Sequence, residues 1–408
     1  MQVNSRAAGS AVVPAVVMGL SPTGLYAVRE LGRAGISVTG MASSIQAGSS
    51  SRYLAHLITA ASPEARLKAL LDRFPAQGEG ASAVLIPTSD EDIAFIASHQ
   101  AALGKRFAFQ ASYTDGTAET VLTKERFYAL CEEMGIAYPR LWKSRLEDIG
   151  ALRGSIKYPC LIKPSRVHEA KALLAGKKGW VVSDEASFDA VVAGIPQGTG
   201  LLLLQEIVPG PESAITLYAA YFDQRGEPQQ AFTARKVRQY PPGFGSASLV
   251  CSQPEPESQA IAERLLRSMG YKGIAAAEFK RDPRDGVLKI IEVNARPSLW
   301  FALTSAAGKQ LALAAYQDLS GAGKALADAP QVDGVWWRFY LKDLYSAVFY
   351  KLKQDFVLPA PDTAGLQTAR AVVYAVFAKD DPAPVFADAL NMARKLFRPL
   401  INRMKRNK

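Results

Sequence analysis

Short apolar runs alternate with amphipathic segments along the first 118 residues of the chain. The apolar runs are predicted strands, and segments with apolar residues three or four positions apart are predicted helices. The strands are expected at 12–18, 36–40 and 83–87, and the helices at 25–34, 63–74 and 91–103. Strands and helices in alternation predict a parallel sheet with helices on its faces.

Two glycines, Gly19 and Gly24, fall in the first predicted strand-to-helix turn. A glycine-rich turn at this place can bind a nucleotide, but the spacing Gly-x-Gly-x-x-Gly is absent. We therefore expect these glycines to serve a tight turn and not a dinucleotide site.

A different pattern follows, in which strands dominate. Thr123 can cap a helix that ends at Gly135, and the later turn Asp282–Gly286 joins two predicted strands. The strands are expected at 160–163, 180–182, 201–205, 214–222, 230–233, 274–280 and 287–294, with a helix at 257–269. Residues beyond 311 look helical, with a Pro-rich break at 357–361.

These patterns predict three units: residues 1–118, residues 119–310 and a basic helical region at 311–408. The middle unit is expected to divide into a small part at 119–200 and a second part at 201–310. A chain of 408 residues is long enough for several packed units.

The composition, 49% hydrophobic and 21% charged, is that of a globular protein. Three cysteines and three histidines are scattered along the chain, which argues against a disulfide framework and a zinc site. A metal would therefore need oxygen ligands. No apolar run reaches about 18 residues, so we expect no membrane-spanning helix and a cytoplasmic protein.

The net charge of +10 is concentrated at the C-terminal end. Residues 336–408 contain 13 Lys and Arg and 6 Asp, so they carry +7, and the preceding residues carry +3. Residues 386–408 place apolar side chains at helical spacing among these cations. This end could contact an anionic membrane surface, or it could be a helical cap with a solvated basic tail. No nucleic-acid motif accompanies it, so a nucleic-acid partner is not expected.

Acidic and amide side chains interrupt the last two apolar strands. Glu292, Asn294 and Arg296 alternate along one strand and should share a face, and Glu278 lies in the neighbouring strand. A hairpin could bring Glu278 close to Glu292. Two carboxylates and an amide oxygen suit Mg²⁺ that also binds phosphate oxygens. The alternative is a solvated hairpin with its charges on the wet face.

Two lysines stand where an anion is a natural partner. Lys163 ends an apolar strand, and Lys124 begins a helix, whose N-terminus favours negative charge. The basic turn 176–179 could close over phosphates. Lys163 alone could equally be an ordinary surface residue.

The segment from Leu201 to Glu212 is an apolar strand that leads into a Pro/Gly turn. Such a segment would offer backbone hydrogen bonds, an apolar wall and one acid, which is enough to bind adenine and ribose.

Taken in their order along the chain, these motifs resemble those of the ATP-grasp superfamily over about residues 12–310. Within it the chain looks most like the predicted carboxylate–amine ligases that include D-aspartate ligase. The motifs are Lys124, Tyr158-Pro-x-x-Ile-Lys163-Pro, Gln205-Glu206-x-Val208-x-Gly, Glu278 and Glu292-x-Asn294-x-Arg296-Pro. The resemblance implies an N-terminal Rossmann-like α/β domain, a small α+β lid and an antiparallel α+β ATP-binding domain. The loop from Lys163 to Trp180 departs from some relatives because it has no multi-glycine run.

The resemblance also implies a role for each matching residue. Six residues would bind ATP: Lys124 and Lys163 at the phosphates, Gln205, Glu206 and the backbone of Val208 at adenine, and Glu212 at ribose. Glu278, Glu292 and Asn294 would bind Mg²⁺. Arg296, together with Lys163, would act in catalysis, and Arg235 and Lys236 would lie at the γ-phosphate or the acceptor carboxylate.

The expected reaction is an ATP-dependent ligation. A substrate carboxylate would attack the γ-phosphorus, and the resulting acyl phosphate would react with an amine, with release of ADP and phosphate. Two alternatives remain open: a carboxylate–thiol ligase of the same fold, and a nucleotide-binding protein without catalysis. No motif identifies the carboxylate or the amine, and a homodimer is the default expectation.

Overall fold

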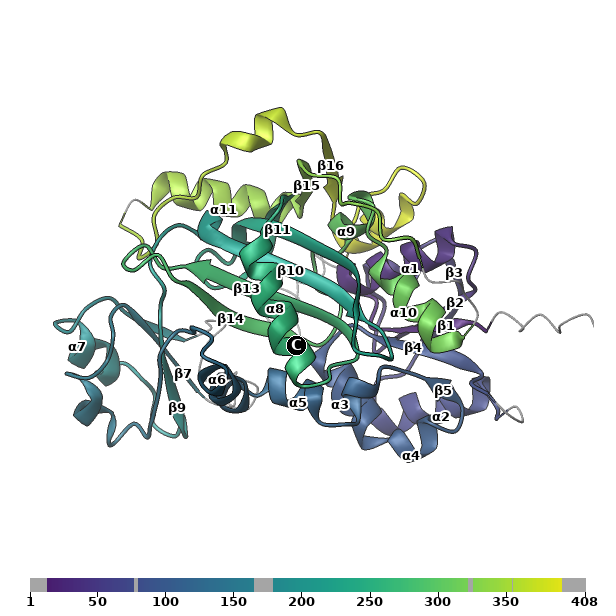
Figure 1. The fold of residues 1–408 in the computed structure, drawn as a ribbon, viewed down its shortest axis with the longest axis horizontal. Coiled ribbons are helices and arrows are strands. Elements are labelled where there is room, and N and C mark those ends of the chain that lie inside the picture. The colour runs from purple at the N-terminus through teal and green to yellow at the C-terminus, as the bar shows by residue number, and fades with distance from the viewer. Residues whose placement is uncertain (1–12, 77–79, 165–178, 322–325, 354, 391–408) are drawn as a thin grey trace, which may run out of the picture.

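The computed structural model describes residues 13–76, 80–164, 179–321, 326–353 and 355–390. These residues form three sheets, with helices packed around them (Figure 1). None of the helices in these ranges has both the length and the apolar character needed to span a bilayer.

The first sheet is parallel, with strand order β3-β2-β1-β4-β5, as the alternating pattern predicts. Its strands are β1 (Ala15–Met18), β2 (Val38–Ala42), β3 (Leu54–Thr59), β4 (Ala83–Pro87) and β5 (Phe107–Ala108). Its helices are α1 (Pro22–Arg33), η1 (Ala47–Ser50), α2 (Pro63–Arg73), α3 (Asp90–Ser98), α4 (Gln100–Leu103) and η2 (Ala111–Tyr113). The sequence pattern missed β3 because this edge strand is largely exposed and carries no continuous apolar run.

The turn after β1 is tight, as expected of its glycines. Gly19 has a φ of +82°, and a Cβ on Gly24 would lie 1.9 Å from the carbonyl oxygen of Gly19. A side chain at position 24 therefore cannot be accommodated without moving the backbone.

The second sheet is small and antiparallel, with strand order β6-β9-β7-β8. It comprises β6 (Leu141–Ser144), β7 (Cys160–Pro164), β8 (Trp180–Val182) and β9 (Leu202–Glu206), with η3 (Ile149–Leu152) and α7 (Phe188–Ala193). Because β9 pairs with β6 and β7, the expected division at 200/201 is wrong: it separates a strand from its own sheet. The 176–178 part of the predicted phosphate-binding turn lies outside the described residues.

The third sheet has seven strands in the order β14-β13-β10-β11-β12-β15-β16. Its strands are β10 (Ile215–Phe222), β11 (Pro228–Tyr240), β12 (Ser246–Ser252), β13 (Gly273–Arg281), β14 (Leu288–Asn294), β15 (Val335–Arg338) and β16 (Ala371–Tyr374). The accompanying helices are α5 (Thr117–Leu122), α6 (Lys124–Glu133), η4 (Glu212–Ala214), α8 (Pro256–Ser268), α9 (Ala302–Ala306), α10 (Leu311–Ser320), α11 (Tyr340–Leu352) and η5 (Ala364–Thr368). Thr123 precedes α6, but its side chain makes no capping hydrogen bond.

Both faces of the third sheet are buried along its inner strand β10. Along β10, Leu217, Ala219 and Tyr221 pack in a core shared with α1 and α10, and the intervening Tyr218 and Ala220 pack in a second core shared with α8. Because alternate side chains of β10 pack in two different cores, this strand holds the N-terminal unit and α8 against the sheet. Few positions along β10 are therefore left for polar residues.

The region after 311 is not wholly helical, contrary to expectation. β15 pairs with β12 and β16 pairs with β15, so this region extends the third sheet. Trp336 and Trp337 lie on opposite faces of β15 and both are buried, in different cores. A strand buried on both faces loses its polar–apolar alternation, which is why the pattern resembled a helix.

Candidate functional site

The predicted carboxylate pair lies on the hairpin of β13 and β14. Glu278 and Glu292 are direct register partners in this antiparallel pair, and Gly286 closes the turn by donating its N–H to the carbonyl of Asp282 at 2.8 Å. Side chains that are opposite each other in such a pair lie on one face of the sheet, about 5 Å apart at Cβ. The two acids therefore meet at one place.

A β-bulge follows the acids. Glu278 pairs with Glu292 but Phe279 pairs with Ile290, so Ile291 has no partner in the ladder. The carbonyl oxygen of Ile291 instead accepts hydrogen bonds from Lys124 Nζ at 2.7 Å and from the Tyr128 hydroxyl at 3.0 Å. The bulge thus turns a backbone oxygen toward α6 and fixes Lys124 beside the carboxylates.

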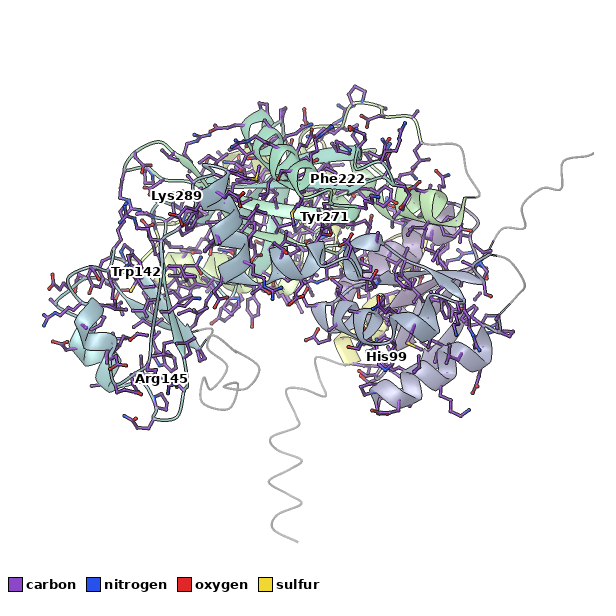
Figure 2. All side chains as sticks on the ribbon, turned by 60° about the horizontal axis from the view of Figure 1, so that its bottom comes forward. His99, Trp142, Arg145, Phe222, Tyr271 and Lys289 are labelled. Atoms are coloured by element: carbon purple, nitrogen blue, oxygen red, sulfur yellow. The ribbon has the colours of Figure 1, made fainter. Side chains whose placement is uncertain are left out.

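A cavity of about 390 Å³ opens over this hairpin, between the small sheet and the third sheet. Seven of the predicted site residues line it: Lys124, Lys163, Gln205, Glu206, Val208, Glu278 and Glu292. Figure 2 shows the two sides of the molecule that meet here, with Trp142 in the small sheet and Lys289 on β14. We refer to this cavity as the carboxylate cleft.

A chain of hydrogen bonds crosses from the small sheet to α6. Lys163 on β7 donates to the Gln205 side-chain oxygen at 3.0 Å, and the Gln205 amide donates to Tyr128 at 2.8 Å. Desolvation lowers the pKa of the Lys124 ammonium, although Glu292 and Glu278 oppose this shift. Lys124 and Lys163 thus both line the cleft and are linked through Gln205 and Tyr128, so a bound anion could contact two cations.

Buried Lys236 on β11 forms an ion pair with Glu278. Its ammonium also donates to the Gln239 side chain at 3.2 Å, and the Asn294 amide donates to Glu292 at 3.3 Å. Two facing carboxylates repel each other, so Glu278 needs a nearby cation even when no metal is bound, and Lys236 supplies it.

The oxygen atoms on this hairpin suit a metal ion that completes its coordination shell with oxygens of a bound substrate or of water. Within the described ranges, no three His, Cys, Asp or Glu side chains gather to hold a metal ion on their own. Glu278, Glu292 and the amide of Asn294 supply only oxygen ligands from one face of the hairpin. This set fits Mg²⁺, which commonly binds one or two carboxylates together with phosphate oxygens and water.

Glu206 is held in an ion cluster. Its buried carboxylate accepts the Arg140 N–H at 3.0 Å and pairs with Arg284 and with Lys289, the latter at 3.4 Å. Burial raises the pKa of Glu206, but the Arg140 hydrogen bond and the two cations outweigh it and lower the pKa below its usual value. The carboxylate thus stays ionised and fixes the end of β9.

Glu212 lies beneath the cleft and does not line it. Its fully buried carboxylate accepts the backbone N–H groups of Gln239 and Gly243, the former at 2.8 Å. Gly243 has a φ of +86°, which side chains rarely adopt. Glu212 therefore holds the turn at 241–245, and this turn forms one wall of the cleft.

Two predicted arginines lie away from the cleft. Arg296 pairs with Asp90, at the start of α3, with 2.7 Å between Nε and Oδ1. Arg235 pairs with Asp362, with 3.7 Å between Nη1 and Oδ2. Asn294 and Lys236 likewise do not line the cavity, although each contacts a carboxylate that does.

The sequence reasoning missed Lys280 and Tyr128. Lys280 lines the cleft two residues after Glu278, donates to the Gly210 carbonyl at 2.8 Å and is buried, which lowers its pKa to about 8. The argument applied to Lys163, a lysine within an apolar strand, would have found it. Tyr128 carried no signal, because an aromatic residue on a helix normally indicates core packing.

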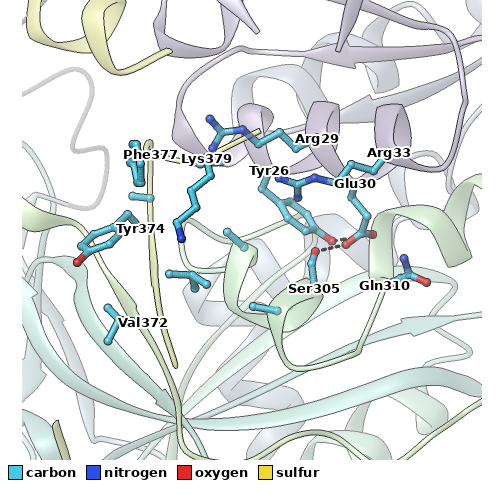
Figure 3. A pocket seen from close by; sticks show the side chains of 15 residues that line it. Tyr26, Arg29, Glu30, Arg33, Ser305, Gln310, Val372, Tyr374, Phe377 and Lys379 are labelled. Carbon is cyan, nitrogen blue, oxygen red and sulfur yellow. Dashed lines mark hydrogen bonds between the residues drawn. The ribbon is translucent and has the colours of Figure 1, made fainter. Parts of the chain in front are cut away.

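A second cavity, of about 480 Å³, lies between α1, α9 and β16 (Figure 3). Its two arginines are paired: Arg29 with Asp381 at 2.9 Å and Arg33 with Asp380 at 2.8 Å. The buried carboxylate of Glu30 accepts the Leu313 N–H at 3.0 Å and the Ser305 hydroxyl. We refer to this cavity as the α1 seam.

The chain is similar to known proteins in part of its sequence and in its fold. No family model matches the sequence. D-aspartate ligase from Enterococcus faecium is 25% identical over 224 residues, which are 52% of this chain and 53% of that protein. The chain thus spans about half the length of this relative.

Two solved structures have a similar fold. N5-carboxyaminoimidazole ribonucleotide synthetase, determined with ADP, has a TM-score of 0.60 at 15% identity, over 79% of this chain and 80% of that one. L-amino acid ligase from Bacillus licheniformis has a TM-score of 0.53 at 16% identity, over 75% and 74%. At this low identity the likeness concerns the fold, and it agrees with the fold that the order of the motifs led us to expect.

Proposed function

We propose that the protein is an ATP-dependent ligase, which activates a carboxylate as an acyl phosphate and joins it to an amine. The observation that carries the proposal is the register pairing of Glu278 with Glu292, in a cavity that Lys124 and Lys163 also line. Clustered carboxylates and lysines suit a nucleoside triphosphate that is bound through a divalent cation.

In this proposal the nucleotide lies along the cleft. Lys124 and Lys163 bind phosphate oxygens, while Gln205, Glu206 and the backbone of Val208 border adenine. Glu212 would act at the ribose through the turn that it holds, because its own carboxylate is engaged by Gln239 and Gly243. The lining of the cleft by Val208 and Leu161 supports an apolar wall for the base.

Glu278, Glu292 and Asn294 would hold Mg²⁺, which when bound supplies positive charge to the phosphate oxygens. Lys236, which pairs with Glu278, would lie toward the γ-phosphate or the second substrate. Arg235 is adjacent to Lys236 on β11 and so points to the opposite face of the sheet, which does not support the same role for it. Arg296 would contact the transferred phosphoryl group, and it would exchange its ion pair with Asp90 for that contact.

The reaction balances without a protein nucleophile. A substrate carboxylate oxygen bonds to the γ-phosphorus as the bond to the β–γ bridging oxygen breaks, and ADP leaves. The amine nitrogen then bonds to the acyl carbon, loses a proton and displaces phosphate. The lysines and Arg296 offset the negative charge that develops in the first step.

The test is ADP release from ATP and Mg²⁺ with a panel of paired amino acids, followed by mass analysis of the product. The names of the D-aspartate and L-amino acid ligases favour amino acids for the first panel. ADP release that requires both partners and yields an amide supports the proposal. A thioester product would indicate a carboxylate–thiol ligase, and ATP binding without ADP release under any pairing would indicate a non-catalytic nucleotide-binding protein.

A further inference from the structure

Helix α11 (Tyr340–Leu352) turns its polar side toward the protein. Asp343 is buried and pairs with Arg238 and Arg338, each with 2.6 Å between Nε and a carboxylate oxygen. Ser346 is also buried and donates its hydroxyl to the Gln239 carbonyl at 2.5 Å. These contacts fix the orientation of α11 on β11 and β15.

The apolar side of α11 consequently faces solvent. We define the α11 apolar face by six residues, which are 45–77% exposed: Tyr340, Leu341, Leu344, Tyr345, Val348 and Leu352. At 3.6 residues per turn they span an arc of about 140° on one side of the helix. A surface helix of a globular protein normally buries such an arc. An exposed apolar patch of this kind marks an interaction site.

The chain continues the same surface near its C-terminal end. Residues 383–390 are helical, and Phe386 and Leu390 are 69% and 59% exposed. This helical segment lies beside the start of α11, because Tyr340 and Leu341 line one apolar cavity with Val385 and Ala389. Figure 1 shows α11 on the outer side of the third sheet, where no other labelled helix covers it.

Positive charge accompanies the α11 apolar face. Lys351 and Lys353, at the end of α11, are exposed. The described chain stops at Leu390, next to the face, and the sequence of residues 391–408 contains seven Lys and Arg and no Asp or Glu. An apolar stripe with flanking cations has the chemistry of a helix that lies in a membrane interface.

We propose that the α11 apolar face binds a bilayer surface that contains anionic lipids. The six side chains would enter the boundary between head groups and acyl chains, and Lys351 and Lys353 would contact lipid phosphates. A second copy of the chain fits less well, because a two-fold contact through this face would bring two sets of these cations together. The inference concerns where the protein works and is independent of its proposed ligase activity.

Vesicle flotation with the full chain tests the proposal. One set of vesicles contains equal parts of phosphatidylcholine and phosphatidylglycerol, and the other contains phosphatidylcholine alone. We expect the protein to float with the anionic set, less so at high salt, and not with the neutral set. The double variant Leu344→Gln, Val348→Gln should lower the partition coefficient at least about tenfold, since both side chains would be buried in the interface.

Matched control variants distinguish binding through the α11 apolar face from non-specific binding through any exposed apolar residue. Ile45 and Leu57 are 52% and 39% exposed in the N-terminal unit, so Ile45→Gln, Leu57→Gln should leave flotation unchanged. Truncation after Leu390 should weaken flotation but retain a part that salt does not remove.

Three outcomes would overturn the proposal. The first is flotation of the Leu344→Gln, Val348→Gln variant at the wild-type level, or no flotation of the wild type. The second is complete loss on truncation, which would assign the binding to the tail alone. The third is a wild-type dimer that the double variant converts to a monomer, which would make a second copy the partner of the face.

Discussion

The carboxylate cleft and the α1 seam are both lined by charged residues, but their charges are arranged in opposite ways. In the seam each arginine faces an aspartate, Arg29 with Asp381 and Arg33 with Asp380. In the cleft Glu278 faces Glu292 across the hairpin, and Lys236 pairs with Glu278. Matched charges hold two parts of a protein together, whereas facing like charges favour a ligand that relieves the repulsion. The arrangement of charges, and not their number, distinguishes a binding site from a structural seam.

Glu292→Gln should have the largest effect. It should lower the rate of ADP release by about a thousandfold, because the loss of a metal-binding carboxylate removes several kcal/mol of charge stabilisation from the transition state. Its free energy of unfolding should change little, because relief of the repulsion from Glu278 is offset by the loss of a negative charge near the buried Lys124 ammonium. Kinetics and urea denaturation measure the two effects, and a variant with the wild-type rate would refute the assignment.

Asp381→Ala should instead lower the stability of the protein and leave ATP binding unchanged. It leaves Arg29, which is 6% exposed, without its carboxylate partner, at a cost of about 3–5 kcal/mol in the free energy of unfolding. Asp380→Ala is the matched control, because the Arg33–Asp380 pair is 43% exposed on both sides and should cost about 0–1 kcal/mol. Urea denaturation measures both, and equal losses would contradict the contrast. ATP affinity of the folded protein should stay the same in both variants.

Glu30 in the seam predicts a pH dependence of stability. Burial raises its pKa from 4.5 to about 7, although hydrogen bonds from Ser305 and Leu313 oppose the shift. The folded state then binds more protons than the unfolded state between these values, so this contribution is complete below pH 4.5 and is lost as pH rises to about 7. Its size is up to about 3 kcal/mol. Glu30→Gln should remove that slope in denaturation series, and an unchanged slope would show that other groups cause it.

Lys163→Ala should have the smallest effect. Loss of one phosphate contact should weaken ATP binding by about tenfold, or about 1.4 kcal/mol, as measured by calorimetry. The control is Lys143→Ala, because Lys143 lies on β6 of the same sheet, is exposed and pairs with Glu125 at 3.4 Å. Equal affinities in the two variants would count against a phosphate-binding role for Lys163.

The sequence predicted the hairpin and the parallel sheet because their signals are local. Period-two alternation and the turn Asp282–Gly286 are enough to place Glu278 near Glu292. The engagement of Glu212 under the turn at 241–245 was not predictable, because its two partners lie 27 and 31 residues away. The strands β15 and β16 were missed for a related reason: whether an apolar run is a strand depends on a partner that is distant in sequence.

The orientation of α11 also could not be derived from periodicity. The pattern of Tyr340, Leu344 and Val348 predicts a helix with one apolar side, but which side is buried depends on Arg238 and Arg338. These arginines come from two strands and meet only at Asp343. An apolar side is expected to face inward by default, and here an ion cluster reverses it.

The bulge at Ile291 makes the cleft tolerant of some changes and intolerant of others. Lys124 and Tyr128 contact the backbone oxygen of this residue, so substitution of its side chain leaves both hydrogen bonds in place. Deletion of Ile291 would instead remove the bulge. Glu292 would stay opposite Glu278, but Lys124 and Tyr128 would lose the backbone oxygen that the bulge turns toward them. Among diverging copies of this chain, the length of β14 should therefore vary less than the identity of the residue at position 291.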